Sequence, residues 1–394
     1  MDSVSGTTGR ARAILERAAE GDRISAAEAR LLFDEAGLMD LGLAADSVRR
    51  RLHPDRVVTY IVDRNINYTN ICVTKCSFCA FYRLPGDATE GYLHPKEVLF
   101  QKIEETLELG GTGILMQGGH HPTLPLEWYE DLLRSFKERY PTLHIHAFSP
   151  PEIQHIVHVS RRPLDEVLDR LKKAGLDSIP GGGGEILVDA VREKISPLKV
   201  SSGDWMAVMD HAHRLGIPST VTMMFGHVES LDDRVEHLAK VREQQDRTGG
   251  FTAFIAWTYK PGNTELRGKE TTSADYLRTQ AIARLFVDNI LNLQSSWVTQ
   301  GTGIGQIALY YGANDMGSVM IEENVVRSAG NTYCTTRDEL ERLIAEAGYH
   351  PRQRDTLYRL VDGRSYPPTE IVTPAASLRA PVERLPRGGA EAPG

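Results

Sequence analysis

Short runs rich in β-branched and aromatic residues alternate with amphipathic helical stretches from residue 57 onward. The helical stretches, such as 96–109 and 164–174, each keep one apolar face. Eight of the short runs are candidate strands, at 57–62, 113–117, 143–148, 176–179, 219–224, 251–257, 295–298 and 318–321. Eight strands that alternate with helices predict an α/β fold, a parallel (β/α) barrel of the TIM type.

The two ends of the chain lie outside this alternation. Residues 1–54 contain helical stretches, one of them behind a capping-box signal at Ser25 and Glu28, and predict an N-terminal helical cap. Residues 55–325 form the predicted barrel, and 326–374 a helical extension. The Pro-, Ala-, Gly- and Arg-rich residues 375–394 predict a disordered tail.

The composition and charge of the chain limit which binding partners and which cellular compartment we expect. The 45 Lys and Arg residues against 53 Asp and Glu residues give a net charge of −8 without a basic block, which argues against nucleic acid as a partner. The N-terminus lacks the apolar segment of a signal peptide, and the long uncharged stretch 290–314 is too polar to span a membrane. Four cysteines are too few for a disulfide-stapled protein of this size. We therefore expect a cytoplasmic protein with no membrane partner.

Three of the four cysteines crowd into eight residues directly after the first predicted strand, at the mouth of the predicted barrel. Cys72, Cys76 and Cys79 have the spacing C-x3-C-x2-C, whereas the fourth, Cys334, is distant and is predicted to be structural. A structural zinc site needs four ligands. An iron–sulfur cube with three cysteine ligands keeps one iron open to a small molecule. The triplet therefore predicts such a [4Fe–4S] cluster, with zinc or plain structural thiols as the alternatives.

This spacing is the signature of the radical SAM superfamily, and the chain resembles that superfamily in further places. The resemblance implies that the open iron binds S-adenosylmethionine (SAM). It also implies that Phe78 lies beside the adenine, and that Gln117, Gly118 and Gly119 bind the methionine end. His120 stands where the superfamily usually has an acidic residue after the glycines. The alternative for this motif is an ordinary turn between a strand and a helix.

A run of four glycines, 181–184, precedes Glu185. Glycines permit close backbone approach and unusual dihedral angles. The resemblance implies that Glu185 faces the SAM ribose or the substrate, and that Arg192 reaches the SAM carboxylate. The alternatives are a helix-capping glutamate and a solvated arginine.

The remaining candidates come from polar residues near the predicted strand ends. The catalytic base stays open among five residues: Glu185, Glu152, Asp315, His120 and His121. Three further polar residues are candidates for contacts with the substrate: Arg83, Ser295 and Thr299.

Within the superfamily, the chain resembles the enzymes of futalosine and deazaflavin metabolism. Four stretches are most similar to the cyclic dehypoxanthinyl futalosine synthase family, at 61–65, 81–83, 260–266 and 294–300. The resemblance implies a cyclising oxidoreductase of menaquinone biosynthesis that acts on dehypoxanthine futalosine and takes electrons from a flavodoxin or ferredoxin. The alternatives are an aminofutalosine synthase, an enzyme of the FO synthase type, an iron–sulfur electron carrier and a zinc-stabilised binding protein.

Overall fold

The structure is a computed structural model that describes residues 6–362. The strands of this part of the chain are β1 (Val57–Ile61), β2 (Asp63–Ile66), β3 (Gly113–Met116), β4 (His144–Ala147), β5 (Ser219–Phe225), β6 (Phe251–Thr258), β7 (Asn292–Gln294), β8 (Asp315–Ser318) and β9 (His350–Arg354).

All ladders between these strands are parallel, and they form two sheets, with the orders β2–β3–β4 and β5–β6–β7–β8–β1–β9. Single parallel bridges link the two sheets, because His146 of β4 pairs with Ser178 and Ile179 pairs with Ser219 of β5. At the other end, β1 leads into β2 through Val62. Taken in order, the pairings lead from β2 round to β1. The predicted α/β class with parallel strands is confirmed, although the ladder is divided into two sheets.

Three predicted strands differ from the observed ones. The run at 176–179 forms only the two single bridges. The seventh strand lies three residues earlier than predicted, because Trp297 begins the short helix α12, where its buried indole donates to the Ser318 carbonyl at 3.2 Å. The eighth strand also lies three residues earlier, at Asp315–Ser318, and Met320 behind it has a φ of 50°. A left-handed residue does not continue a strand.

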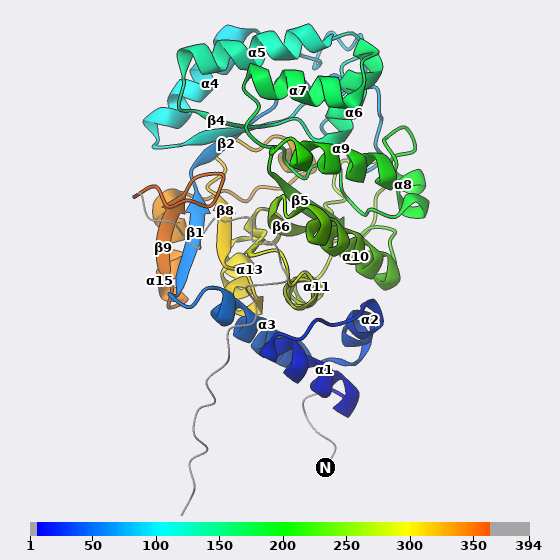
Figure 1. The fold of residues 1–394 in the computed structure, drawn as a ribbon, viewed down its shortest axis with the longest axis vertical. Helices are drawn as coiled ribbons and strands as arrows, with labels where there is room; N and C mark the ends of the chain where they lie inside the picture. The colour runs from blue at the N-terminus through cyan, green and yellow to red at the C-terminus, as the bar shows by residue number, and fades with distance from the viewer. Residues whose placement is uncertain (1–5, 363–394) are drawn as a thin grey trace, which may run out of the picture.

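The helices surround the sheets (Figure 1). Helices α4 and α5 lie on the side of β2–β3–β4, and α10 and α11 lie on the side of β5 and β6. The long helices of this part are α4 (Lys96–Glu108), α5 (Leu126–Arg139), α6 (Pro150–Ser160), α7 (Leu164–Ala174), α8 (Asp189–Ile195), α9 (Ser202–Arg214), α10 (Leu231–Thr248) and α11 (Ser273–Phe286). Four short ones are α12 (Trp297–Gln300), α13 (Thr302–Ile307), the 3₁₀ helix η1 (Ala308–Tyr311) and α14 (Val325–Ser328).

The N-terminal segment forms the helices α1 (Gly9–Glu20), α2 (Ala26–Glu35) and α3 (Leu38–Leu52). The capping box of α2 is present as predicted, with Ser25 and Glu28 bonded to each other's backbone amides. These helices pack on α10, α11 and η1, at the lower end of the view in Figure 1. The guanidinium of Arg278 in α11 donates to the Ala36 carbonyl at 2.6 Å. The N-terminal helices therefore cover part of the outer helical layer.

The C-terminal segment contains helix α15 (Arg337–Glu346) and also a strand, β9, where only helix was expected. Strand β9 lies parallel to β1, with Val57 opposite His350 and Ile61 opposite Arg354. The sequence His-Pro-Arg-Gln-Arg has no apolar alternation, so β9 gave no strand signal. The predicted tail, 375–394, lies outside the described residues.

Candidate active site

The cysteine-bearing loop follows β2 at its C-terminal end. Its ends are joined, because the Cys72 amide donates to the Arg83 carbonyl at 2.9 Å. Its middle is held from two sides. The amide and hydroxyl of Ser77 donate to the Ile195 carbonyl at 2.9 and 3.0 Å, and the Leu266 amide donates to the Ser77 carbonyl at 2.8 Å. The end of α8 and the segment after β6 therefore fix the loop in place.

The three thiols of this loop lie close enough to affect one another's ionisation. Burial raises the pKa of Cys76 to about 12, and the Lys199 ammonium opposes this rise, whereas Cys79 and Cys72 add to it. Burial also raises the pKa of Cys79. Thiols that burial keeps protonated become thiolates when a metal binds. Within residues 6–362, no three His, Cys, Asp or Glu side chains converge on a point that could hold a single metal ion.

The Gly-Gly turn after β3 packs directly on the cysteine loop. A Cβ on Gly119 would lie 2.3 Å from the Ile71 carbonyl oxygen and 2.9 Å from Cys72 Cβ. A Cβ on Gly118 would lie 2.5 Å from the Tyr68 ring. Contacts this short require the backbone or the ring to move. The two glycines therefore have a packing role toward the protein, in addition to the role toward SAM that the resemblance implies.

Glu152 holds this turn from the other side. Its Oε1 accepts hydrogen bonds from the Gly118 amide at 2.8 Å and the Tyr68 hydroxyl at 3.1 Å. Its Oε2 accepts bonds from the amide and hydroxyl of Ser149 at 2.8 and 2.7 Å, which forms the capping box of α6. Burial raises the pKa of Glu152, and the four donors oppose that rise. Both oxygens are occupied, so this arrangement supports a positioning role rather than the catalytic base.

The glycine run 181–184 also faces protein. A Cβ on Gly181 would lie 2.6 Å from Val221 Cα on β5, and a Cβ on Gly182 would lie 2.2 Å from Gln117 Nε2. Gly183 has a φ of 72°, in the region that favours glycine. The run therefore lies flat on β5 and brings Gln117, one of the predicted SAM contacts, against its backbone.

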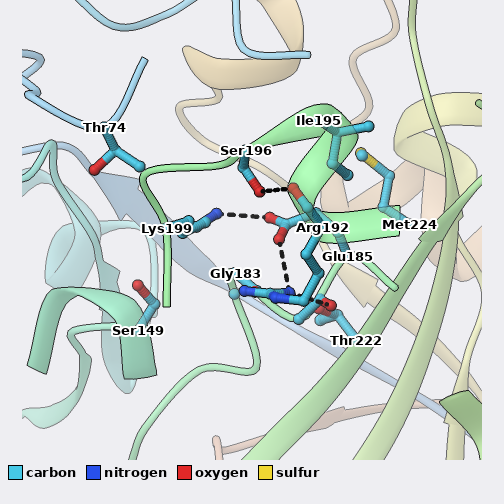
Figure 2. A network of polar contacts seen from close by, with 12 residues as sticks. Thr74, Ser149, Gly183, Glu185, Arg192, Ile195, Ser196, Lys199, Thr222 and Met224 are labelled. Atoms are coloured by element: carbon cyan, nitrogen blue, oxygen red, sulfur yellow. Dashed lines mark hydrogen bonds and ion pairs between the residues drawn. The ribbon is translucent and has the colours of Figure 1, made fainter. Parts of the chain in front are cut away.

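A buried ionic network follows the glycine run (Figure 2). Glu185 Oε1 accepts a bond from Lys199 Nζ at 2.8 Å, and its Oε2 lies 3.6 Å from Arg192 Nη1. Every guanidinium nitrogen of Arg192 donates to a backbone carbonyl, of Gly183, Gly184 or Val200. Arg192 therefore braces the glycine run, and the predicted contact with the SAM carboxylate would require it to leave these bonds.

Lys199 is the buried cation that sequence reasoning missed. It lies on the loop after α8, and its ammonium is 5.3 Å from the centre of the Phe78 ring. Burial acts to lower its pKa, but the charges of Glu185 and Cys76 outweigh burial, so the pKa lies above its usual value. The neighbours of Lys199 in the sequence, such as Pro197, Leu198 and Val200, give it no distinguishing spacing, and only the fold brings it beside the cysteine loop.

The predicted histidine pair lies beside the cysteine loop, because the Val73 amide donates to the His120 carbonyl at 3.1 Å. His120 Nδ1 is 2.6 Å from the Thr74 hydroxyl, and its ring stacks on His155 with centroids 5.0 Å apart. Burial, with smaller contributions from His155 and Lys199, lowers the pKa of His120 well below its usual value. Burial also lowers the pKa of His121. Both side chains are therefore neutral near pH 7.

A cavity of about 270 Å³ lies inside the ring of strands. Gln117 and the predicted substrate-binding residue Thr299 line it, together with the loop that follows β9. Further polar residues of its wall are Asp63, Asn65, Thr222, Gln294, Ser296 and Ser318. Because Gly181 and Gly182 also belong to the wall, the cavity adjoins the segments that surround the cysteine loop. The cavity wall is mostly apolar with a few polar side chains, which is typical of a small-molecule site.

Three predicted site residues have protein partners instead. The Asp315 carboxylate accepts hydrogen bonds from Nε and Nη2 of Arg354 at 2.6 and 2.9 Å. The Ser295 hydroxyl donates to the Gly305 carbonyl at 2.8 Å. The Arg83 guanidinium pairs with Glu90 and with carbonyls of its own loop, at residues 80–82. These partners show structural bonds at positions where the sequence indicated a base or substrate contacts.

Comparison with known proteins decides the family. A radical SAM superfamily model matches residues 66–241, and a model described as the CofH/MqnC C-terminal region matches residues 248–365. The cyclic dehypoxanthine futalosine synthase of Halalkalibacterium halodurans is 47% identical over 349 residues, which cover 88% of this chain and 94% of that protein. The chain belongs to the radical SAM superfamily. Its matches place it in the CofH/MqnC group of that superfamily.

Other relatives of this radical SAM protein carry different names. The 5-amino-6-(D-ribitylamino)uracil–L-tyrosine 4-hydroxyphenyl transferase of Methanothermobacter thermautotrophicus is 41% identical, with coverage of 90% of this chain and 98% of that protein. The aminodeoxyfutalosine synthase of Thermus thermophilus is 39% identical, with coverage of 88% of this chain and 95% of that protein. The crystal structure of methylornithine synthase matches with a TM-score of 0.66 and 17% identity, covering 86% of this chain and 97% of that one. At that identity the match supports the fold alone.

The residues present fit the groups that the superfamily implies, a [4Fe–4S] cluster and SAM. Cys72, Cys76 and Cys79 carry the three-thiol motif on one fixed loop. Beside that loop, Glu185 Oε2 is buried and, apart from the ion pair with Arg192 at 3.6 Å, has no hydrogen-bond partner among the described residues. A buried acceptor of this kind is costly unless a donor completes it. No helix within residues 6–362 is long and apolar enough to cross a membrane.

Proposed function

We propose that this radical SAM protein is a cyclic dehypoxanthine futalosine synthase, which closes a ring in dehypoxanthine futalosine during menaquinone biosynthesis. The observation that carries the proposal is the 47% identity over nearly the whole length to a protein of that name, against 41% and 39% to relatives with other names. The cavity that adjoins the segments around the cysteine loop supports it, because a small substrate and SAM must meet there.

The proposed reaction balances in atoms and electrons. Cys72, Cys76 and Cys79 would hold the cluster, which would supply the electron for the cleavage of SAM to a 5′-deoxyadenosyl radical. The substrate gives up its C4′ hydrogen atom to that radical, and its C4′ then forms a bond to the aryl ring. The ring finally loses one proton and one electron, and the electron passes to an acceptor of the iron–sulfur class, which balances the electron that cleaved SAM. The chain must exclude water, hold the two ligands in contact and accept the proton.

The chain's own residues divide into a cofactor part and a substrate part. We assign Cys72, Cys76 and Cys79 as the cluster ligands. Lys199 has three N–H donors and one acceptor, Glu185, among the described residues. We assign its remaining donors to the SAM carboxylate, in place of Arg192. Gln117 and Thr299 remain the proposed polar contacts within the cavity.

The test of the reaction is anaerobic incubation with SAM, a reductant and dehypoxanthine futalosine, followed by mass spectrometry. We expect a product lighter by two hydrogens and one 5′-deoxyadenosine per product. Deuterium at C4′ of the substrate should appear in the 5′-deoxyadenosine. A covalent adenosyl adduct, or label retained in the nucleoside product, would contradict the cyclase and favour an aminofutalosine synthase.

The test of the cofactor site uses single variants. Each Cys→Ala change in the triplet should abolish SAM cleavage and lower iron content, whereas Cys334→Ala should keep both, because Cys334 is exposed. Lys199→Met should weaken SAM binding roughly tenfold to a hundredfold while iron content holds, which is the range for a lost charge-assisted bond. Unchanged SAM affinity would remove Lys199 from the site. We further propose a flavodoxin or ferredoxin as the electron donor and the cytoplasm as the location.

A further inference from the structure

Asp63 is a carboxyl group in the wall of the cavity that the sequence did not single out as a base. It begins β2, and Ser318, at the end of the adjacent strand β8 that pairs with β1, donates its hydroxyl to Asp63 Oδ1. Its other oxygen, Oδ2, accepts no hydrogen bond from any residue in the part of the chain that the structure describes. One oxygen thus orients the group, and the other is available to a molecule in the cavity.

The other titratable groups of the cavity wall are occupied or neutral. Both oxygens of Glu323 accept backbone amides of the first turn of α14 at 2.9–3.0 Å. His146 Nδ1 lies 2.6 Å from the Ser178 hydroxyl, and burial lowers its pKa to about 3. The Arg354 guanidinium is bonded to Asp315 and stacks on the Tyr358 ring at 3.9 Å. Burial keeps Tyr358 protonated by raising its pKa.

We propose that Asp63 accepts the proton that the aryl ring loses after ring closure. This inference rests on the proposed cyclisation. In the step, the ring C–H bond breaks, the proton moves to Asp63 Oδ2, and the electron passes to a one-electron acceptor of the iron–sulfur class. The aromatic ring is restored, and Asp63 later returns the proton to water.

The charges around Asp63 suit this task. Burial raises the pKa of Asp63 to about 6; the Ser318 hydroxyl and the Arg354 guanidinium oppose the rise, and Asp315 adds to it. A base whose pKa is near the working pH is deprotonated and still takes a proton readily. The rate of product formation should therefore fall as the pH drops through about 6, because the carboxylate then becomes protonated and cannot accept the proton. His146 and Tyr358 do not titrate in that range, since their pKa values are about 3 and well above neutral.

Asp63→Asn tests the proposal, because asparagine keeps an acceptor for Ser318 but cannot take a proton. Asp55→Asn is the matched control, an exposed aspartate that precedes β1. The substrate carries deuterium at C4′, and four quantities are measured: iron content, SAM affinity, deuterium in 5′-deoxyadenosine and ring-closed product. We expect Asp63→Asn to keep the first three and to lose about 10²- to 10⁴-fold in product rate. Asp63→Glu should recover part of the loss, and the acidic limb near pH 6 should vanish in the asparagine variant.

Two results would overturn the inference while wild type still closes the ring. One is a normal product rate and pH profile in Asp63→Asn. The other is a loss of substrate binding together with the deuterium transfer, since Asp63 would then bind substrate instead of accepting the proton. If the wild-type protein itself forms no ring-closed product, the proposed cyclisation fails, and the role of Asp63 fails with it.

Discussion

Glu152→Gln is the substitution whose cost follows most directly from the contacts. The carboxylate accepts four hydrogen bonds, two of them from the backbone amides of Gly118 and Ser149 at 2.8 Å. Glutamine has one acceptor oxygen, and its NH₂ group only donates. The Tyr68 and Ser149 hydroxyls can rotate to accept, but a backbone amide cannot. In either orientation, one buried amide therefore faces another donor.

The expected cost is about 2–4 kcal/mol in the free energy of unfolding. A hydrogen bond to a charged group contributes roughly 1.5–3 kcal/mol, and a buried donor without a partner costs roughly 1–3 kcal/mol. Relief of the buried charge offsets part of that sum, because burial disfavours the ionised form of Glu152.

Anaerobic urea denaturation, followed by tryptophan fluorescence and circular dichroism, measures the cost. Glu28→Gln is the matched control, because Glu28 occupies the same capping-box position, bonded to the amide and hydroxyl of Ser25, but is partly exposed. It should lose only about 0.5–1 kcal/mol. If Glu152→Gln costs no more than the control, the reasoning from four donors is refuted.

Two further predictions concern the Gly118–Gly119 turn and the loss of stability at low pH. Gly119→Val should lower both iron content and SAM affinity. Its Cβ would lie 2.3 Å from the Ile71 carbonyl oxygen, and this overpacking would displace the cysteine loop by roughly 1 Å. Gly303→Ala is the control and should leave both quantities unchanged, because the space around Gly303 is open. Three buried histidines have pKa values lowered to about 3, chiefly by burial: His53, His146 and His237. Each neutral histidine contributes fully to the free energy of unfolding above pH 6.5. This contribution is lost as the pH falls, and the loss is on the order of 2 kcal/mol for each histidine at pH 5. Urea midpoints at pH 7.5 and 5 check this, and equal midpoints would contradict it.

The sequence was sufficient for features that depend on local spacing. The cysteine triplet, the capping box at Ser25 and Glu28, and the parallel α/β class all follow from residues close together in the chain. Strand β9 was missed because its pairing joins Val57 to His350, across most of the chain, and its polar sequence shows no period. The seventh and eighth strands were displaced because short apolar runs do not reveal where a buried Trp297 turns the chain into helix.

Polar site residues were harder to assign, because a side chain's role depends on which partners it already has. Arg192 and Glu152 carry the charges that a cofactor or a base would need. In the structure, Arg192 already donates to three backbone carbonyls. Glu152 already accepts hydrogen bonds from four donors. Lys199 and Asp63 have unused capacity in the folded chain, but nothing in their sequence neighbourhood marks them. Which charged groups remain available for chemistry is a property of the fold.

The glycines show why stability and cofactor binding are linked in this protein. Gly119 contacts the cysteine loop, Gly182 contacts Gln117, and Glu152 joins the Gly118 turn to α6. The same backbone segments thus pack the ends of the strands and surround the cysteine loop. A substitution there alters the position of the cysteines even when it touches no ligand. Loss of activity in such a variant identifies a ligand contact only if iron content and the free energy of unfolding are measured alongside it and stay unchanged.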